Sequence, residues 1–182
     1  MLDAYDIQID HRITTCIFPT PNPGYFIIWG KNYTHYFRVR DWRSKEWQSA
    51  WPQLVQDVQP IVDAADVPIT GPDGEDEDTV TPPLADVDKG IELNGVADGG
   101  HEWLVINKKE ATRFSFVKTV RKPYDAVVAC VLLRAYMLAP RQFKLSSDGF
   151  WDEREWIDAR QLYETLWPDE TLESPFQEEE EA

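Results

Sequence analysis

Apolar and polar residues alternate along much of the first 43 residues, which is the two-residue period of a β-strand. Segments 7–18, 25–29 and 33–40 follow this period, and the last two flank a short turn that contains Gly30. In segment 33–40 every second side chain, beginning with Tyr33, falls on one face. The intervening side chains, beginning with Thr34, fall on the opposite face, and we expect one of these two faces to enter the core.

The apolar period then lengthens to that of an amphipathic α-helix. Apolar residues recur at intervals of three and four between Trp47 and Val58. Pro52 interrupts this pattern, so the helix either begins near Ser49, with Pro52 in its first turn, or is kinked at Pro52. We expect Pro60 to end the helix or to begin a second short turn.

Residues 69–89 are rich in proline, glycine and acidic residues, a composition that buries too little apolar surface to order itself. We predict a mobile linker or surface loop there. It separates an N-terminal part, residues 1–68, from a C-terminal part, residues 90–173, although both parts are also compatible with one domain. Residues 174–182 end in a run of glutamates and are expected to form a disordered acidic tail.

The C-terminal part begins with a predicted hairpin, formed by residues 91–93 and 101–107 and continued by a strand within 112–118. Residues 124–139 are apolar on every side, which is typical of a central, buried helix. Its only basic residue, Arg134, is expected to reach outward along its aliphatic stem.

A last helix is predicted from the apolar stripe between Trp156 and Trp167, and it should end at Pro168. Residues 146–149, Ser-Ser-Asp-Gly, offer capping side chains ahead of an acidic first turn. Strands that come in runs and do not alternate with helices predict an α+β fold, with an antiparallel sheet packed against about three helices.

Length and composition agree with a folded chain: 182 residues, 42% of them apolar, and eight tryptophans. No apolar run is long enough to span a membrane, and the N-terminus lacks the pattern of a signal peptide. Two cysteines, Cys16 and Cys130, are too few for a disulfide framework. We therefore expect a cytoplasmic protein that does not enter membranes.

The net charge of −15 is unevenly distributed along the chain. Residues 71–90 hold seven acids and one base, residues 148–182 hold thirteen and two, and residues 91–147 carry a net charge of +4. This asymmetry argues against nucleic-acid binding by the whole surface, although nucleic-acid mimicry by the carboxylates stays open. Three basic residues before the buried helix form a candidate anion site: Lys118, Arg121 and Lys122.

Sequence signatures of enzymes are absent: the chain contains no GxxxxGK[ST], GxGxxG, HExxH, CxxC or GxSxG motif. The best candidate for a catalytic or cation site is the combination of His101, Glu102, Asp98, Asp125 and Asp148. Neighbouring residues on a strand point to opposite faces, which keeps His101 and Glu102 apart. We therefore predict no catalytic residue, metal site or cofactor.

Three segments resemble a set of uncharacterised small proteins from bacteriophages and prophage-type genes. They are KTVRKPYD at 118–125, SSDG at 146–149 and NGVADGGHEW at 94–103. The resemblance implies a phage-type origin, and hence the cytoplasm of a host cell, but it implies no particular activity or site residue.

The many tryptophans either fill a small core or anchor a protein interface. Trp47 and Trp151 are the candidate anchors, with a neighbouring acidic cluster made of Asp152, Glu153, Glu155 and Asp158. We predict a non-enzymatic interaction protein, such as a regulator or inhibitor that binds a host or phage protein through an aromatic and acidic surface. A small enzyme with a carboxylate–histidine or metal site, and a minor virion or assembly protein, are the alternatives.

Overall fold

A computed structural model describes residues 33–73, 79–109 and 114–176 of the chain. One antiparallel sheet has the strand order β6-β1-β7, formed by β1 (Thr34–Val39), β6 (Ser115–Lys118) and β7 (Phe143–Ser147). In the second sheet β4 (Gly90–Gly95) pairs antiparallel with three other strands: β2 (Ile69–Thr70), β3 (Leu84–Asp86) and β5 (Leu104–Ile106). A short 3₁₀ helix, Ala97–Gly99, lies between β4 and β5.

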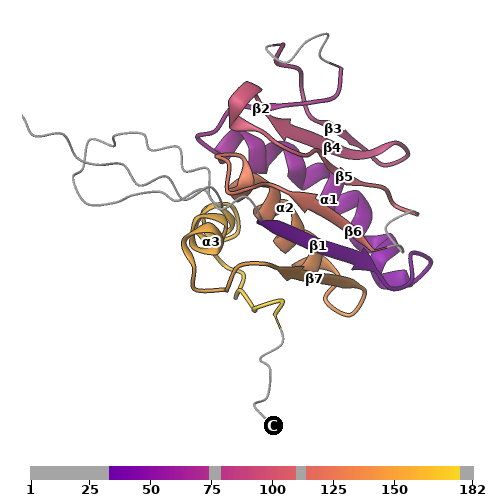
Figure 1. Cartoon of the computed structure of the whole chain (residues 1–182). Coiled ribbons are helices and arrows are strands. Elements are labelled where there is room, and N and C mark those ends of the chain that lie inside the picture. Colours follow the sequence, from indigo (N-terminus) through magenta and orange to yellow (C-terminus); the bar gives the residue numbers. More distant parts are fainter. Residues whose placement is uncertain (1–32, 74–78, 110–113, 177–182) are drawn as a thin grey trace, which may run out of the picture.

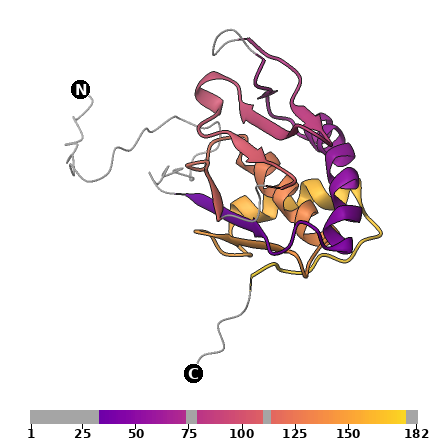
Figure 2. The same ribbon diagram turned by 90° about the vertical axis from the view of Figure 1, so that its right-hand side faces the viewer.

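Three helices pack behind the strands: α1 (Lys45–Ala64), α2 (Asp125–Leu138) and α3 (Arg154–Leu166) (Figure 1). Helix α2 contacts α1, α3 and β7, whereas α1 also contacts β3 and β4 of the second sheet. Figure 2 shows the layers of strands and helices from the side. The α+β class with antiparallel strands and about three helices is thus confirmed. Within the described ranges, no helix combines the length and apolarity needed to cross a bilayer.

Strand β1 has the predicted alternation. Tyr33, His35, Phe37 and Val39 face inward and are at most 2% exposed, while Arg38 on the opposite face is exposed. The pattern fixes this register because a shift by one residue would expose the whole apolar set. The other strands expected in segments 7–18 and 25–29 lie outside the described residues.

Helix α1 is longer than expected, because neither proline ends it. Ser44 caps its N-terminus by accepting a hydrogen bond from the Trp47 amide at 3.2 Å, and both Pro52 and Pro60 lie inside the helix. Proline frees the carbonyl four residues before it, which for Pro60 is that of exposed Gln56. Water can donate a hydrogen bond to such an exposed carbonyl. Packing of the buried apolar stripe then holds the helix against the core. The predictions of a start near Ser49 and of an end at Pro60 were wrong.

The segment 69–89 differs from the expected linker or loop. Its ends form strands β2 and β3, and both pair with β4. Ile69 at one end is buried in the same apolar cluster as Phe37 from the N-terminal part and Val131 from the C-terminal part. Composition missed these strands because each has only two or three residues, and they are held by pairing with β4. Residues 74–78 lie outside the described residues.

The hairpin of β4 and β5 and the strand β6 lie where the sequence predicts them. Leu104 and Ile106 are fully buried, whereas Trp103 and Val105 on the other face of β5 are 38% and 41% exposed. The hairpin therefore packs one apolar face on the core and leaves the other in contact with solvent.

Helix α2 is buried as predicted, but its arginine does not reach outward. Arg134 is 5% exposed, and its Nε lies 2.7 Å from the Oδ2 atom of Asp57 in α1. Its Nη1 donates to the Tyr163 hydroxyl at 2.8 Å and to Glu170 at 2.9 Å. Burial lowers the pKa of Arg134, but its hydrogen bonds, first of all the one to Asp57, raise the pKa above the ordinary value. The network joins all three helices.

Helix α3 begins later than the Ser-Ser-Asp-Gly segment predicts. Strand β7 extends through Ser147, which pairs with His35, and the helix starts only at Arg154 with Glu153 in the capping position. Ser147 therefore does not cap α3. The expected disordered tail also differs at its start, because the ring of Phe176 lies 5.0 Å from that of Trp156. Residues 177–182 lie outside the described residues.

Acid should weaken this helical network through Glu170. Partial burial raises the pKa of its carboxyl, but hydrogen bonds from Tyr163 and Arg134 lower it below the ordinary value of 4.5. A lowered folded pKa contributes stability above pH 4.5, and this contribution is lost as the pH falls through the folded pKa. Urea unfolding at a series of pH values should show a shallower acid-side slope for Glu170→Gln. The neighbouring variant Asp169→Asn should keep the wild-type slope; equal slopes in all three proteins would contradict the role of Glu170.

Candidate functional site

The outer face of the sheet β6-β1-β7 (Figure 1) carries exposed aromatic side chains. Tyr36 of β1 is directly opposite Phe116 of β6, and its ring stacks on that of Phe114 with 5.5 Å between centroids. Phe114 and Phe116 are 66% and 57% exposed. Large apolar side chains in such a group on a rigid sheet are unusual for a surface that contacts only water.

Basic residues lie beside these rings on the same face. Arg38 of β1 is opposite Lys144 of β7, and the amide of Arg40 bonds to Gln142 just beyond that pair. None of these three basic side chains forms an ion pair with another residue in the described part of the chain. We call the six residues that form this surface the outer face: Tyr36, Phe114, Phe116, Arg38, Arg40 and Lys144.

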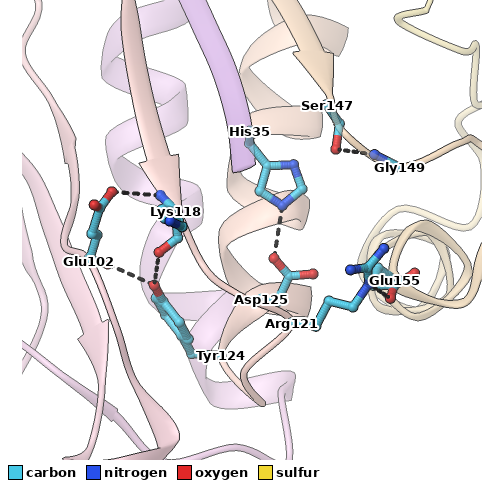
Figure 3. Close-up of polar contacts among 9 residues, drawn as sticks. All are labelled: His35, Glu102, Lys118, Arg121, Tyr124, Asp125, Ser147, Gly149 and Glu155. Carbon is cyan, nitrogen blue, oxygen red and sulfur yellow. Dashed lines mark hydrogen bonds and ion pairs between the residues drawn. The ribbon is translucent and has the colours of Figure 1, made fainter. Parts of the chain in front are cut away.

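Beneath the outer face lies a buried polar cluster, drawn in Figure 3. The Nε2 atom of His35 in β1 lies 2.8 Å from Oδ1 of Asp125 at the start of α2, and both side chains are at most 5% exposed. Within the described residues, three buried polar atoms around this pair have no hydrogen-bond partner: His35 Nδ1, Thr119 Oγ1 and Asp125 Oδ2. Such orphaned atoms mark a strained or functional place in a fold.

An ion pair lies at the edge of this cluster. The Nε atom of Arg121 is 2.6 Å from Glu155, and its guanidinium lies 4.3 Å from the ring centre of Tyr33. Val120 and Arg121 both have positive φ angles, 48° and 57°, in the loop before α2. A β-branched residue is strained there, so contacts around the loop must hold it. Burial, and next the charge of Asp125, raise the pKa of the Tyr33 hydroxyl.

The cluster has the residue types of acid–base chemistry but not the access. Ser147 is directly opposite His35, yet its hydroxyl accepts a hydrogen bond from the amide of Gly149 at 3.2 Å. His35 is fully buried, so a substrate does not reach its imidazole in this conformation. In this geometry the His35–Asp125 pair links β1 to the first turn of α2.

The five residues of the predicted catalytic combination do not come together. Glu102 accepts a hydrogen bond from the Lys118 amide at 2.8 Å, and Asp148 accepts one from the Tyr36 hydroxyl at 3.1 Å. Asp125 is bound to His35, as described above. Asp98 and His101 line an open depression of about 350 Å³ beside Trp103. In the described ranges, no three His, Cys, Asp or Glu side chains form a group able to hold a metal ion.

The predicted anion site is also dispersed. Arg121 is paired with Glu155, and the Lys122 ammonium donates to the Asp98 carbonyl at 2.7 Å. Lys118 is opposite Thr34 in the sheet, on the outer side. The three charges therefore do not converge on one position at the N-terminus of α2.

Comparison of the chain with protein-family models, curated proteins and solved structures gives no match.

The two predicted tryptophan anchors lie in different environments. Trp47 is fully buried between α1 and the core, and its indole donates to the Lys108 carbonyl at 3.2 Å, so it is a core residue. Trp151 is half-buried, with Phe176 at 6.0 Å between ring centroids and Arg160 at 4.7 Å from its ring. Trp47 is therefore not a surface anchor, because none of its surface is exposed.

The predicted acidic cluster is largely occupied by local contacts. Asp158 is 3.7 Å from Arg154 and Asp152 is 3.9 Å from Arg160, whereas Glu155 holds Arg121. Glu153 accepts a hydrogen bond from the Phe150 amide. Exposed pairs of this kind contribute little energy, but they lower the free charge available to a partner.

Sequence reasoning missed the outer face for a physical reason. Segment 114–118 reads Phe-Ser-Phe-Val-Lys, so either face of the strand carries apolar residues. The strand buries Val117, and both phenylalanines consequently point outward. The available signal was in β1, where Tyr36 and Arg38 share the face opposite the apolar set.

Proposed function

We propose that this chain is a non-enzymatic binding protein and that the outer face is its contact surface. The observation that supports the proposal is the exposure of Phe114 and Phe116, 66% and 57%, on a sheet face that no described helix covers. With the resemblance to phage-type proteins, the proposed partner is a molecule of the host cell or of the phage. The surface is aromatic and basic, which revises the earlier expectation of an aromatic and acidic one.

The sheet makes these rings effective for binding. Pairing with β6 and β7 fixes the backbone at Tyr36, and pairing of β6 with β1 fixes it at Phe116, so this backbone loses little conformational freedom when a partner arrives. Rigid aromatic residues and arginines, close together and easily desolvated, supply most of the energy in typical interfaces. The closed His35–Asp125 pair offers no comparable support for an enzyme, because both side chains are covered.

A matched pair of phenylalanine variants tests the proposal. Phe116→Ser should lower the amount of bound macromolecule captured from a bacterial lysate by about fivefold or more, because an interface hot spot is removed. Phe150→Ser changes a phenylalanine in the loop after β7 that is even more exposed, at 74%, and should leave capture unchanged. Thermal unfolding serves to show that both variants stay folded. Equal capture by wild type and Phe116→Ser would contradict the proposed surface, and Phe114→Ser provides a second variant.

A further inference from the structure

We infer that the ligand of the outer face is single-stranded nucleic acid, bound by base stacking on the rings and by phosphate contacts to the neighbouring cations. This inference rests on the proposed function, since it names the partner of the same surface. The expectation against nucleic-acid binding concerned the whole surface and its net charge of −15. The outer face is locally basic, so the inference limits that expectation to the rest of the surface.

Three aromatic rings lie close together on the outer face. Pairing of β1 with β6 places Tyr36 beside Phe116, and Phe114 follows one position along the face of β6. Both phenylalanines keep more than half of their surface exposed. Sheets that bind single strands use such rings as platforms, because every base has a face that stacks on an aromatic side chain. The outer face offers this contact on two adjacent strands.

Basic side chains lie in line with these rings. Register places Phe114 across from Arg38, because its neighbour Ser115 is paired with Phe37, and Arg38 is in turn opposite Lys144. Phe114, Arg38 and Lys144 therefore lie in one row across the sheet, and Arg40 lies farther along β1. A strand whose bases stack on the rings would bring its phosphates to these side chains.

The charge of these cations is the third observation. Five arginines form ion pairs in the described part of the chain, namely Arg121, Arg134, Arg141, Arg154 and Arg160. Arg38, Arg40 and Lys144, like several other basic residues, form none there, although the chain has 33 acidic and 18 basic residues. What distinguishes these three is their position beside exposed rings, which suits an anionic ligand that also carries aromatic surface. Nucleic acid has both properties.

A single strand fits better than a duplex. The bases of a duplex are stacked on each other, and its grooves admit a protruding helix or ribbon. The outer face is a sheet surface whose rings need unstacked bases. An acidic protein segment would match the cations but would leave the stacking surface of Phe114 and Phe116 without a planar partner.

The test uses the full chain and fluorescein-labelled oligonucleotides of twelve thymidines or twelve uridines, followed by fluorescence anisotropy. We expect dissociation constants of about 10–100 µM, the range of sequence-independent binding, and at least tenfold weaker binding of a duplex of the same length. Three phosphate contacts predict a slope of log affinity against log salt of about −2. A polyglutamate peptide is added as competitor and should not displace the oligonucleotide.

Four variants separate stacking from charge. Phe116→Ser should weaken oligonucleotide binding about tenfold, the effect of losing one base stack, and leave the salt slope unchanged. Arg38→Gln should reduce the slope by about 0.7. Phe150→Ser and Arg154→Gln alter an exposed phenylalanine and an exposed arginine away from the outer face, and both should bind as the wild type does.

The outcomes of this inference and of the proposed function are distinguishable. If no oligonucleotide binds, or polyglutamate competes as an equal, the inference is overturned; continued dependence of protein capture on Phe116 then leaves the proposed function intact. Oligonucleotide binding that is insensitive to both Phe116→Ser and Arg38→Gln also overturns the inference, because the ligand then lies elsewhere. If neither capture nor oligonucleotide binding depends on Phe116, both proposals fail.

Discussion

Replacing Asp57 by alanine should destabilise the protein by about 3–5 kcal/mol, because it leaves a buried guanidinium without its closest counter-ion. Asp57 and Arg134 are 7% and 5% exposed, and 2.7 Å separates the Oδ2 and Nε atoms. Tyr163 and Glu170 keep their bonds to Arg134, but neither lies on α1. The variant therefore removes the one ionic link between α1 and α2, and urea unfolding measures the loss.

Helix α1 supplies its own control for this prediction. Asp57 accepts a hydrogen bond from Gln53 four residues earlier, and exposed Asp63 accepts the same bond from Gln59. Asp63→Ala should cost less than about 0.5 kcal/mol, since only a surface contact is lost. Adding Arg134→Met to Asp57→Ala should recover much of the stability by removing a buried charge that has lost its closest counter-ion. A cost below about 1 kcal/mol for Asp57→Ala alone would contradict the prediction, because Glu170 and Tyr163 would then suffice to stabilise the guanidinium.

Periodicity was sufficient to predict most of the elements. The alternation in 33–40 and the three-to-four spacing from Trp47 onward each reflect one buried face, which local sequence records directly. Element ends were less accurate, because they depend on tertiary contacts. Prolines inside α1 are tolerated where packing holds the helix, and β7 extends because Ser147 pairs with β1.

Long-range polar pairs were the part that sequence reasoning did not find. His35 and Asp125 are 90 residues apart, and Asp57 and Arg134 are 77 residues apart. The sequence nevertheless contains a signal for the pairing of Asp57 with Arg134. Asp57 lies within the apolar stripe of α1, and Arg134 is the only basic residue of a wholly apolar helix. A lone acid and a lone base on two buried faces are expected to pair, since an unpaired buried charge is too costly.

The candidate binding surface could not be predicted from the sequence for a different reason. A surface is formed by several strands, and neighbouring strands in the sheet are distant in the chain: β6, β1 and β7 come from residues 115–118, 34–39 and 143–147. Each strand alone contributes one or two unremarkable residues. Only the register brings Phe116 beside Tyr36 and Lys144 beside Arg38. Composition likewise drew attention to tryptophans, of which Trp47, Trp51 and Trp156 are fully buried core residues.

Leu132→Ala should destabilise the protein by about 2–5 kcal/mol, the range for deleting a fully buried leucine. Leu132 is 0% exposed in α2, the helix that contacts α1, α3 and β7 together. Its neighbours belong to several elements, each fixed by its own pairing or packing, so they are unable to close the space left by the side chain. Chemical denaturation with an unchanged m-value would measure this loss as a change in stability alone.

Leu138, the last residue of the same helix, separates the effect of burial from that of helix propensity. It is only partly buried, so Leu138→Ala removes the same atoms with a smaller transfer loss and leaves no closed cavity. Alanine has the higher helix propensity, which slightly favours both variants. The difference between the two costs therefore reports the cavity at Leu132. Equal costs would mean that the middle of α2 repacks freely, and α2 would then not be the rigid element that holds α1, α3 and β7 together.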